Sequence, residues 1–209
     1  MDTASPERPS FKQRQFEARE DAILDAAHQL IATKGYDLTT VDEVANAVGI
    51  AKASLYKHFA SKEALATAAM LRTLRRTLAF VDQLSPDLNP IQSMRALLDW
   101  ALRLRLAGGL PTLPSGNSVL REALSNDPDY SAAVVQLSGR LMIWIHMGKA
   151  FGLIRPDLPD EVVLLSLYAR SCDPTVDFLK ESGSLSDDQI VASMLTIYFD
   201  GIAPQPPKG

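Results

Sequence analysis

The stretch "GIAKASLYKHFASKEAL", residues 49–65, decides which fold this sequence indicates. It begins with a glycine, places Leu55 and Phe59 four residues apart, and gathers four Lys or His side chains around Tyr56. Residues four apart lie on the same face of a helix. The stretch therefore predicts a short helix whose inner face is apolar and whose outer face is cationic.

A second short helix precedes this one in "TTVDEVANAVG", residues 39–49. Thr40 followed three residues later by Glu43 is a capping box, which marks a helix start, and Gly49 is a typical helix stop. The apolar residues between them recur at the spacing of one helix face: Val41, Val44, Ala45 and Val48. Two short helices joined by such a turn, and packed on a longer preceding helix, form a helix-turn-helix. Its second helix enters the major groove of DNA.

The side chains predicted to face outward are of types that DNA-binding proteins use. The lysines can neutralise phosphates, and the hydroxyls of Thr and Tyr can donate to phosphate oxygens. The small Ala and Ser and the planar His can approach base edges. The candidate DNA contacts are Thr40, Lys52, Ala53, Ser54, Tyr56, Lys57, His58 and Lys62.

Composition narrows the class of protein further. The net charge of −4 argues against a protein that coats nucleic acid without regard to sequence. The charge is unevenly placed, however: residues 1–80 hold 11 Lys/Arg and 10 Asp/Glu, whereas residues 81–209 hold 10 Lys/Arg and 15 Asp/Glu. The two parts are therefore expected to meet different partners. One cysteine, Cys172, excludes an intramolecular disulfide framework and a multi-thiolate metal site. No apolar run reaches the roughly 20 residues of a membrane span, and no signal core starts the chain, so we expect a cytoplasmic protein.

Apolar residues along the rest of the chain recur at spacings of three and four, which predicts an all-α fold. We expect helices near residues 17–33, 62–82, 90–107, 117–126, 128–152, 159–182 and 186–200. Pro174 should either kink the helix over 159–182 or restart it with Asp173 as its cap. The expected organisation is a loose arm (1–16), a helix-turn-helix domain (17–62), a larger helical domain (63–203) and a tail (204–209).

The segment "TTVDEVANAVGIAKASLYKHFASKEALATAA", residues 39–69, resembles the DNA-binding region of the TetR family of bacterial transcriptional regulators. The resemblance runs from about Arg19 to Met70 and implies a three-helix DNA-binding domain followed by a larger helical domain that binds a small ligand and forms a homodimer. It also implies that the candidate positions above, Ala53 excepted, contact DNA. This chain departs from the family pattern at Ala51, usually Ser, and at Ala53, often Gly. Loss of the Ser hydroxyl removes a helix cap worth about 1 kcal/mol.

The larger domain carries no comparable fingerprint. The stretch "QLSGRLMIWIHMGKAFG", residues 136–152, is apolar on nearly all sides, which predicts a central helix. Candidate ligand contacts, which could equally fill the core, are Trp100, Leu104, Met142, Ile143, His146 and Met147. The resemblance assigns the dimer interface to the helices near 159–182 and 186–200.

Together, the candidate DNA contacts and the resemblance to the TetR family predict a ligand-responsive repressor that binds a palindromic operator in double-stranded DNA as a homodimer. Activation, and binding that the ligand promotes, stay open. One alternative is a helical ligand-binding or interaction protein that does not bind DNA. Another is a serine hydrolase using Ser54-x-x-Lys57, but its partner motifs S-D-N and K-T-G are missing. No H-E-x-x-H pair occurs, so we expect no metal, no cofactor and no enzymatic activity.

Overall fold

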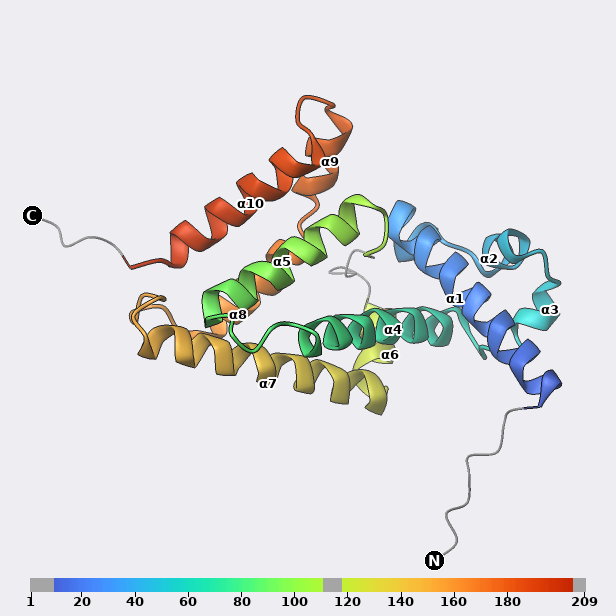
Figure 1. Cartoon of the computed structure of the whole chain (residues 1–209). Helices are drawn as coiled ribbons and strands as arrows, with labels where there is room; N and C mark the ends of the chain where they lie inside the picture. Colours follow the sequence, from blue (N-terminus) through green and yellow to red (C-terminus); the bar gives the residue numbers. More distant parts are fainter. Residues whose placement is uncertain (1–9, 111–117, 205–209) are drawn as a thin grey trace, which may run out of the picture.

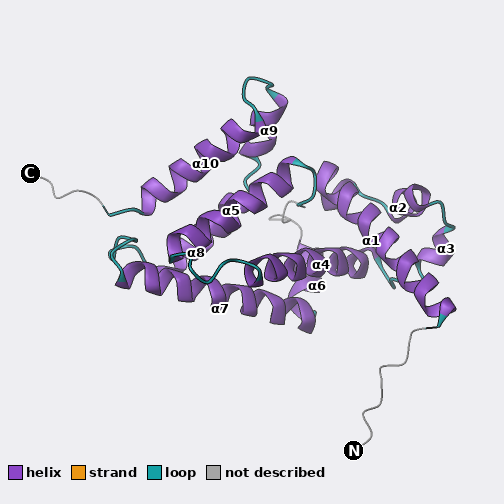
Figure 2. Ribbon diagram, in the orientation of Figure 1, coloured by secondary structure: helices purple, strands orange, loops and turns teal. Residues whose placement is uncertain are grey.

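The computed structural model describes residues 10–110 and 118–204, and these ranges contain helices but no strand (Figures 1 and 2). The helices are α1 (Phe11–Leu38), α2 (Val41–Val48), α3 (Lys52–Leu55), α4 (Lys62–Asp82), α5 (Pro90–Leu106), α6 (Ser118–Asn126), α7 (Pro128–Ala150), α8 (Asp160–Ser171), α9 (Thr175–Glu181) and α10 (Asp187–Ile202). The predicted all-α fold is confirmed. Within the described part of the chain, no helix is both long and apolar enough to cross a membrane.

Helices α1 to α3 lie together at one end of the molecule, and α4 runs from them toward the remaining helices (Figure 1). A small core joins these elements. Ile23 of α1, Val44 of α2 and Leu55 of α3 are fully buried in it, together with Leu65 and Ala69 of α4. Because α4 also packs along α7, it is the element that links the two parts of the molecule.

Side-chain caps fix where several of these helices begin. The Thr40 hydroxyl accepts from the Glu43 backbone N–H while the Glu43 carboxylate accepts from the Thr40 N–H, which is the predicted capping box. Gly49 ends α2 in the left-handed conformation, with φ of 74°. Ser61 caps α4 by accepting a hydrogen bond from the Ala64 N–H at 3.1 Å. Ala51, in contrast, begins α3 without any side-chain cap.

The first helix begins earlier than predicted. Ser10 accepts a hydrogen bond from the Gln13 N–H at 3.2 Å and caps α1, so residues 11–16 are helical and do not belong to a loose arm. At the other end, the helical path breaks at Gly35, whose φ is 82°, close to the predicted stop. The rest of the predicted arm, residues 1–9, and residues 205–209 of the predicted tail lie outside the described residues.

The helix predicted over residues 159–182 is two helices, α8 and α9. Pro174 has no N–H to donate, and its ring would clash with the carbonyl four residues earlier in a continuous helix, so a new helix begins there. Asp173 accepts a hydrogen bond from the Thr175 N–H at 2.9 Å. Of the two alternatives for Pro174, the restart is therefore confirmed.

Helix α7 packs against several neighbours, α4, α5, α6 and α8, as expected of a central helix, but it is not covered on all sides. Leu141 and Ile145 are buried in the larger core, but Ile143, Met147 and Phe151 on another face are 55%, 42% and 61% exposed. A helix that is apolar all round can be buried on any face, so its sequence pattern alone does not select one.

Candidate functional site

Helix α3 and the turn after it present most of the candidate DNA contacts on one surface. Tyr56 is 45% exposed, and Thr40, Lys52, Ala53 and Lys57 are exposed as well. Ser54 is half-buried. We call the residues Lys52, Ala53, Ser54, Tyr56 and Lys57 the α3 surface.

The orientation of the α3 surface is fixed by backbone hydrogen bonds and by buried apolar side chains on its inner side. Regular helix ends at Leu55, and the Lys57 and His58 N–H groups then donate to the carbonyls of Ser54 and Leu55 at 3.2 and 2.9 Å. Leu55 is fully buried and Phe59 is 8% exposed. Two apolar anchors four residues apart therefore fix the orientation of the residues between them.

The three lysines near this surface differ in their availability. The Lys52 Nζ lies 2.7 Å from the Asp42 Oδ2, and this hydrogen bond raises the Lys52 pKa. The Lys62 Nζ lies 4.2 Å from the centre of the Tyr36 ring, within range of a cation–π contact. Lys57 makes no ion pair with any of the residues that the structure describes. Lys57 is thus the cation most available to a phosphate.

His58 does not point outward, contrary to the prediction. Its side chain is 3% exposed, its ring stacks on Phe16 with centroids 4.1 Å apart, and its Nδ1 lies 3.6 Å from the Glu20 Oε2. The N-terminal part of α1 supplies both Phe16 and Glu20. Since Phe16 was predicted to lie in a loose arm, its contact with His58 was missed. Phe16 and His58 are far apart in the sequence, so no local pattern indicated this contact.

The Thr40 hydroxyl is exposed but already engaged. It donates to the Glu43 Oε2 at 2.8 Å, and the Lys34 Nζ lies 2.5 Å from the Glu43 Oε1. The hydrogen bond from Lys34, followed by those from Thr40, lowers the pKa of Glu43 to about 2. Thr40 therefore has a structural role in the capping box, and its predicted phosphate contact is additional to that role.

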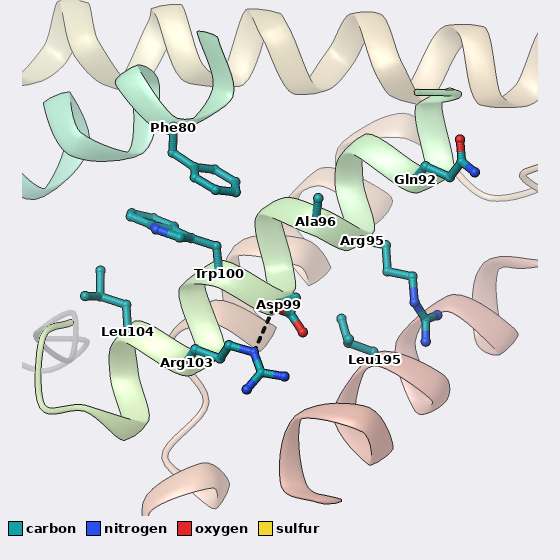
Figure 3. A pocket seen from close by; sticks show the side chains of 9 residues that line it. All are labelled: Phe80, Gln92, Arg95, Ala96, Asp99, Trp100, Arg103, Leu104 and Leu195. Carbon is teal, nitrogen blue, oxygen red and sulfur yellow. Dashed lines mark hydrogen bonds and ion pairs between the residues drawn. The ribbon is translucent and has the colours of Figure 1, made fainter. Parts of the chain in front are cut away.

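An open groove lies on the outer side of α5 (Figure 3). The groove has a volume of about 730 Å³. Arg95 and Leu104 of α5 line it, together with Leu195 of α10. Phe80 of α4 stacks on Trp100 with ring centroids 4.8 Å apart. The charged residues of the groove are partly paired, because the Arg103 Nε donates a hydrogen bond to the Asp99 carboxylate at 2.9 Å. We call this the outer groove.

A second, apolar cavity of about 330 Å³ lies between α4, α5, α7 and α8. Met70, Leu74 and Thr77 of α4 form one wall, and Leu137 and Leu141 of α7 face them. Trp100 lines both this apolar cavity and the outer groove. Trp100 therefore borders both spaces.

Of the predicted ligand contacts, only Trp100 and Leu104 line either space. The α7 residues Met142, Ile143, His146 and Met147 line neither. His146 instead lies at the surface, where its Nε2 is 2.8 Å from the Asp160 Oδ2. A different face of α7, which includes Leu137 and Leu141, borders the cavity, so the predicted ligand contacts on α7 stay a prediction that this cavity does not support. Among the described residues, no group of three or more His, Cys, Asp or Glu is placed to hold a metal ion.

Comparison with known proteins agrees with this geometry. The sequence profile described as bacterial regulatory proteins, tetR family, matches residues 23–69. The transcriptional regulator TcmR of Streptomyces glaucescens is 31% identical over 91 residues, which cover 44% of this chain and 40% of that protein. The transcriptional repressor KstR2 of Mycolicibacterium smegmatis is 27% identical over 203 residues, covering 95% of each chain.

A likeness extends over nearly the whole fold in solved structures. The fatty acid degradation regulator FadR of Bacillus halodurans superposes with a TM-score of 0.67 at 18% identity, over 94% of this chain and 98% of that one. The match therefore includes the helices beyond the helix-turn-helix, where the sequence carries no fingerprint. With its helix-turn-helix, its surrounding fold and its full-length relatives in agreement, the chain belongs to the TetR family of bacterial transcriptional regulators.

Proposed function

We propose that this DNA-binding regulator is a cytoplasmic, ligand-responsive repressor that acts as a homodimer on a palindromic operator. The observation that carries the proposal is the α3 surface, where exposed Tyr56 and Lys57 project from a segment anchored by buried Leu55, and where Lys57 has no ion pair within the described part of the chain. KstR2, which is similar over its full length, is named a repressor, and this supports repression over activation. Regulators of this family are not enzymes, so the Ser54-x-x-Lys57 match has no catalytic meaning.

In the proposed complex, α3 lies in the major groove while the start of α2 contacts the backbone. Lys57 would neutralise a phosphate and Tyr56 would donate to a phosphate oxygen. Ala53 and Ser54 are small enough for base edges to approach. Lys52 and Lys62 would contribute more weakly to phosphate binding, because Asp42 and the Tyr36 ring already hold their ammonium groups. Thr40 would add a contact at the N-terminus of α2.

Dimerisation is proposed through α8, α9 and α10. Val162, Phe178 and Ile197, one on each of these helices, are 50%, 69% and 65% exposed. Apolar side chains at this exposure favour burial against a second copy. A two-fold dimer would place two α3 surfaces on half-sites about 34–36 Å apart, which a palindromic operator requires.

The effector is proposed to act through α4. Residues of α4 line the apolar cavity, and the same helix is bound to α1, where the Arg72 Nη2 lies 2.6 Å from the Asp25 Oδ1. A ligand that shifts α4 would therefore shift α1 and change the separation of the two α3 surfaces. A typical coupling free energy for such a switch is about 1–3 kcal/mol. On this basis we propose that the DNA-binding domain and the ligand-binding domain meet near residue 62, where α4 begins.

The test is an electrophoretic mobility shift with DNA from upstream of the protein's own gene. Tyr56→Ala and Lys57→Ala should each weaken the shifted complex, and Arg140→Ala should not, because it removes an exposed cation from α7 instead. The rival function is a helical interaction protein that does not bind DNA. A shift that neither α3 variant weakens would contradict the proposed role of α3.

A further inference from the structure

The apolar cavity has an uncharged lining. Among the described residues that border it, none is Asp, Glu, Lys, Arg or His. Moving an ionised group from water into such surroundings without a partner costs several kcal/mol. The outer groove differs, because Arg95, Asp99 and Arg103 line it. The two spaces therefore select for different kinds of molecule.

Most hydroxyl groups in the lining are already used within their own helices. The Thr73 hydroxyl donates to the Ala69 carbonyl at 3.2 Å, and the Thr77 hydroxyl donates to the Thr73 carbonyl at 2.9 Å. The Ser171 hydroxyl donates to the Tyr168 carbonyl at 2.8 Å. These residues therefore present mainly their carbon atoms to the cavity.

The two tyrosines in the lining differ in the state of their hydroxyls. The Tyr168 hydroxyl is hydrogen-bonded to the Ser138 hydroxyl at 2.9 Å. The Tyr130 hydroxyl has no hydrogen bond with any residue in the described ranges. Burial raises the pKa of Tyr130, so the phenol is neutral and can donate at neutral pH. Among the hydroxyl groups of the described lining residues, that of Tyr130 is thus the one available to bind a ligand.

We propose that the effector is an uncharged, largely apolar molecule with a single oxygen that hydrogen-bonds to the Tyr130 hydroxyl. The inference rests on the proposed ligand-responsive function and specifies the chemical class of its ligand. A volume of about 330 Å³ is near the lower end of the range for ligand pockets, so the molecule is small. Its apolar part lies against α4, α5 and α7, and Tyr130 fixes its orientation.

The first experiment compares three probes of equal chain length: 1-decanol, decanoate and decylammonium. The chain has two Trp residues, so Trp144→Phe leaves Trp100, which lines the cavity, as the only indole reporter. Fluorescence titration should show that decanol binds at least about tenfold more tightly than either ion. Absence of decanol binding, or equal or tighter binding of decanoate or decylammonium, would overturn the proposal.

The second experiment tests Tyr130 against a matched tyrosine in the same lining. Tyr130→Phe should weaken decanol binding by about two- to tenfold, the loss expected for one neutral hydrogen bond. It should leave binding of 1-chlorononane, which has no hydroxyl, unchanged. Tyr168→Phe should change decanol affinity less than Tyr130→Phe does, because the Tyr168 hydroxyl is already bonded to Ser138. Equal losses in the two variants, or an equal loss for both probes, would exclude the role given to Tyr130.

Binding to the cavity and regulation of DNA are measured separately. Decanol that binds with the expected selectivity while leaving the operator complex unchanged would support the binding chemistry assigned to the apolar cavity and to Tyr130, and would contradict the ligand-responsive function. An operator complex that decanoate disrupts and decanol does not would support a ligand-responsive function and overturn the inference.

Discussion

The helix-turn-helix and the larger helical part of this protein differ in where their functional groups lie. Around α2 and α3 the core is small, and the proposed DNA-contacting side chains are those that point away from it, such as Tyr56 and Lys57. Between α4, α5, α7 and α8 the candidate site is the space that the side chains leave open. Helical periodicity separates inward from outward residues, so it identifies a functional surface. It does not report a cavity.

Truncating one buried leucine in each part tests this difference and should have the largest effect. Leu55 is fully buried behind the α3 surface, and Leu141 is 1% exposed in the larger core and lines the apolar cavity. Replacing either by Ala should lower the free energy of unfolding by about 2–5 kcal/mol. Urea unfolding measures both losses. Only Leu55→Ala should abolish operator binding under conditions where both variants remain folded, since Leu55, unlike Leu141, anchors the α3 surface.

The reverse pattern would contradict the comparison. If Leu141→Ala abolished operator binding and Leu55→Ala retained it, the geometry of α3 would depend on the larger core more than on its own anchors. The free energy of ligand binding gives an independent readout, because Leu141→Ala should also change affinity for molecules in the apolar cavity.

The two lysines of the α3 surface sharpen the comparison within one region. Lys57→Ala should weaken DNA binding for all sequences and reduce the slope of log affinity against log salt by about 1. Lys52→Ala should reduce that slope less, because Asp42 already neutralises part of the Lys52 charge at 2.7 Å. Titration of labelled operator at several salt concentrations measures both slopes. An equal reduction in the two variants would mean that the Lys52–Asp42 pair opens when DNA binds.

Much of the fold follows from local sequence signals. The bounds of α4 agree with the prediction because Ser61 is a strong cap and the apolar stripe that follows is regular. The capping box of Thr40 and Glu43 and the stop at Gly49 likewise fix α2. These signals involve residues within one or two helical turns of each other, so their physics is contained in the sequence.

The features that could not be predicted depend on contacts between distant segments. His58 is buried because Phe16, 42 positions earlier, stacks on it, and no local pattern relates the two. The apolar faces of α7 are nearly equivalent in sequence, and its neighbours decide which one borders the cavity. For that reason the sequence pattern did not distinguish Met142 and Ile143, which do not line the apolar cavity, from the residues that do.

The missing cap of α3 gives a prediction of smaller magnitude. Ala51 has the extended conformation of a cap residue, with φ of −67° and ψ of 141°, but no side-chain hydrogen bond. Ala51→Ser should stabilise the protein by about 0.5–1 kcal/mol, because its hydroxyl can accept from a free N–H of the first turn. Ala53→Ser, inside α3, is the control and should not stabilise. Thermal unfolding compares them, and equal gains would show that capping is not the cause.

The pH dependence of the capping box should give the smallest effect, because Glu43 is exposed at the surface. Its pKa is lowered from 4.5 to about 2, first by the hydrogen bond from Lys34 and then by those from Thr40. The folded state therefore favours the carboxylate over the acid. The stability that this ion provides is complete above pH 4.5 and is lost as the pH falls through about 2.

Glu43→Gln keeps the shape of the cap but cannot ionise, so the variant should melt at a lower temperature than the natural protein at neutral pH. The difference in Tm should shrink between pH 4.5 and about 2, as Glu43 of the natural protein becomes protonated. Lys34→Gln removes the first cause of the shift and should move this window toward higher pH. A difference in Tm that stays constant over this range would show that the Gln side chain disturbs the helix start for reasons other than charge. In that case the apparent strength of the capping box would come from its geometry, as it does for the uncharged cap at Ser61.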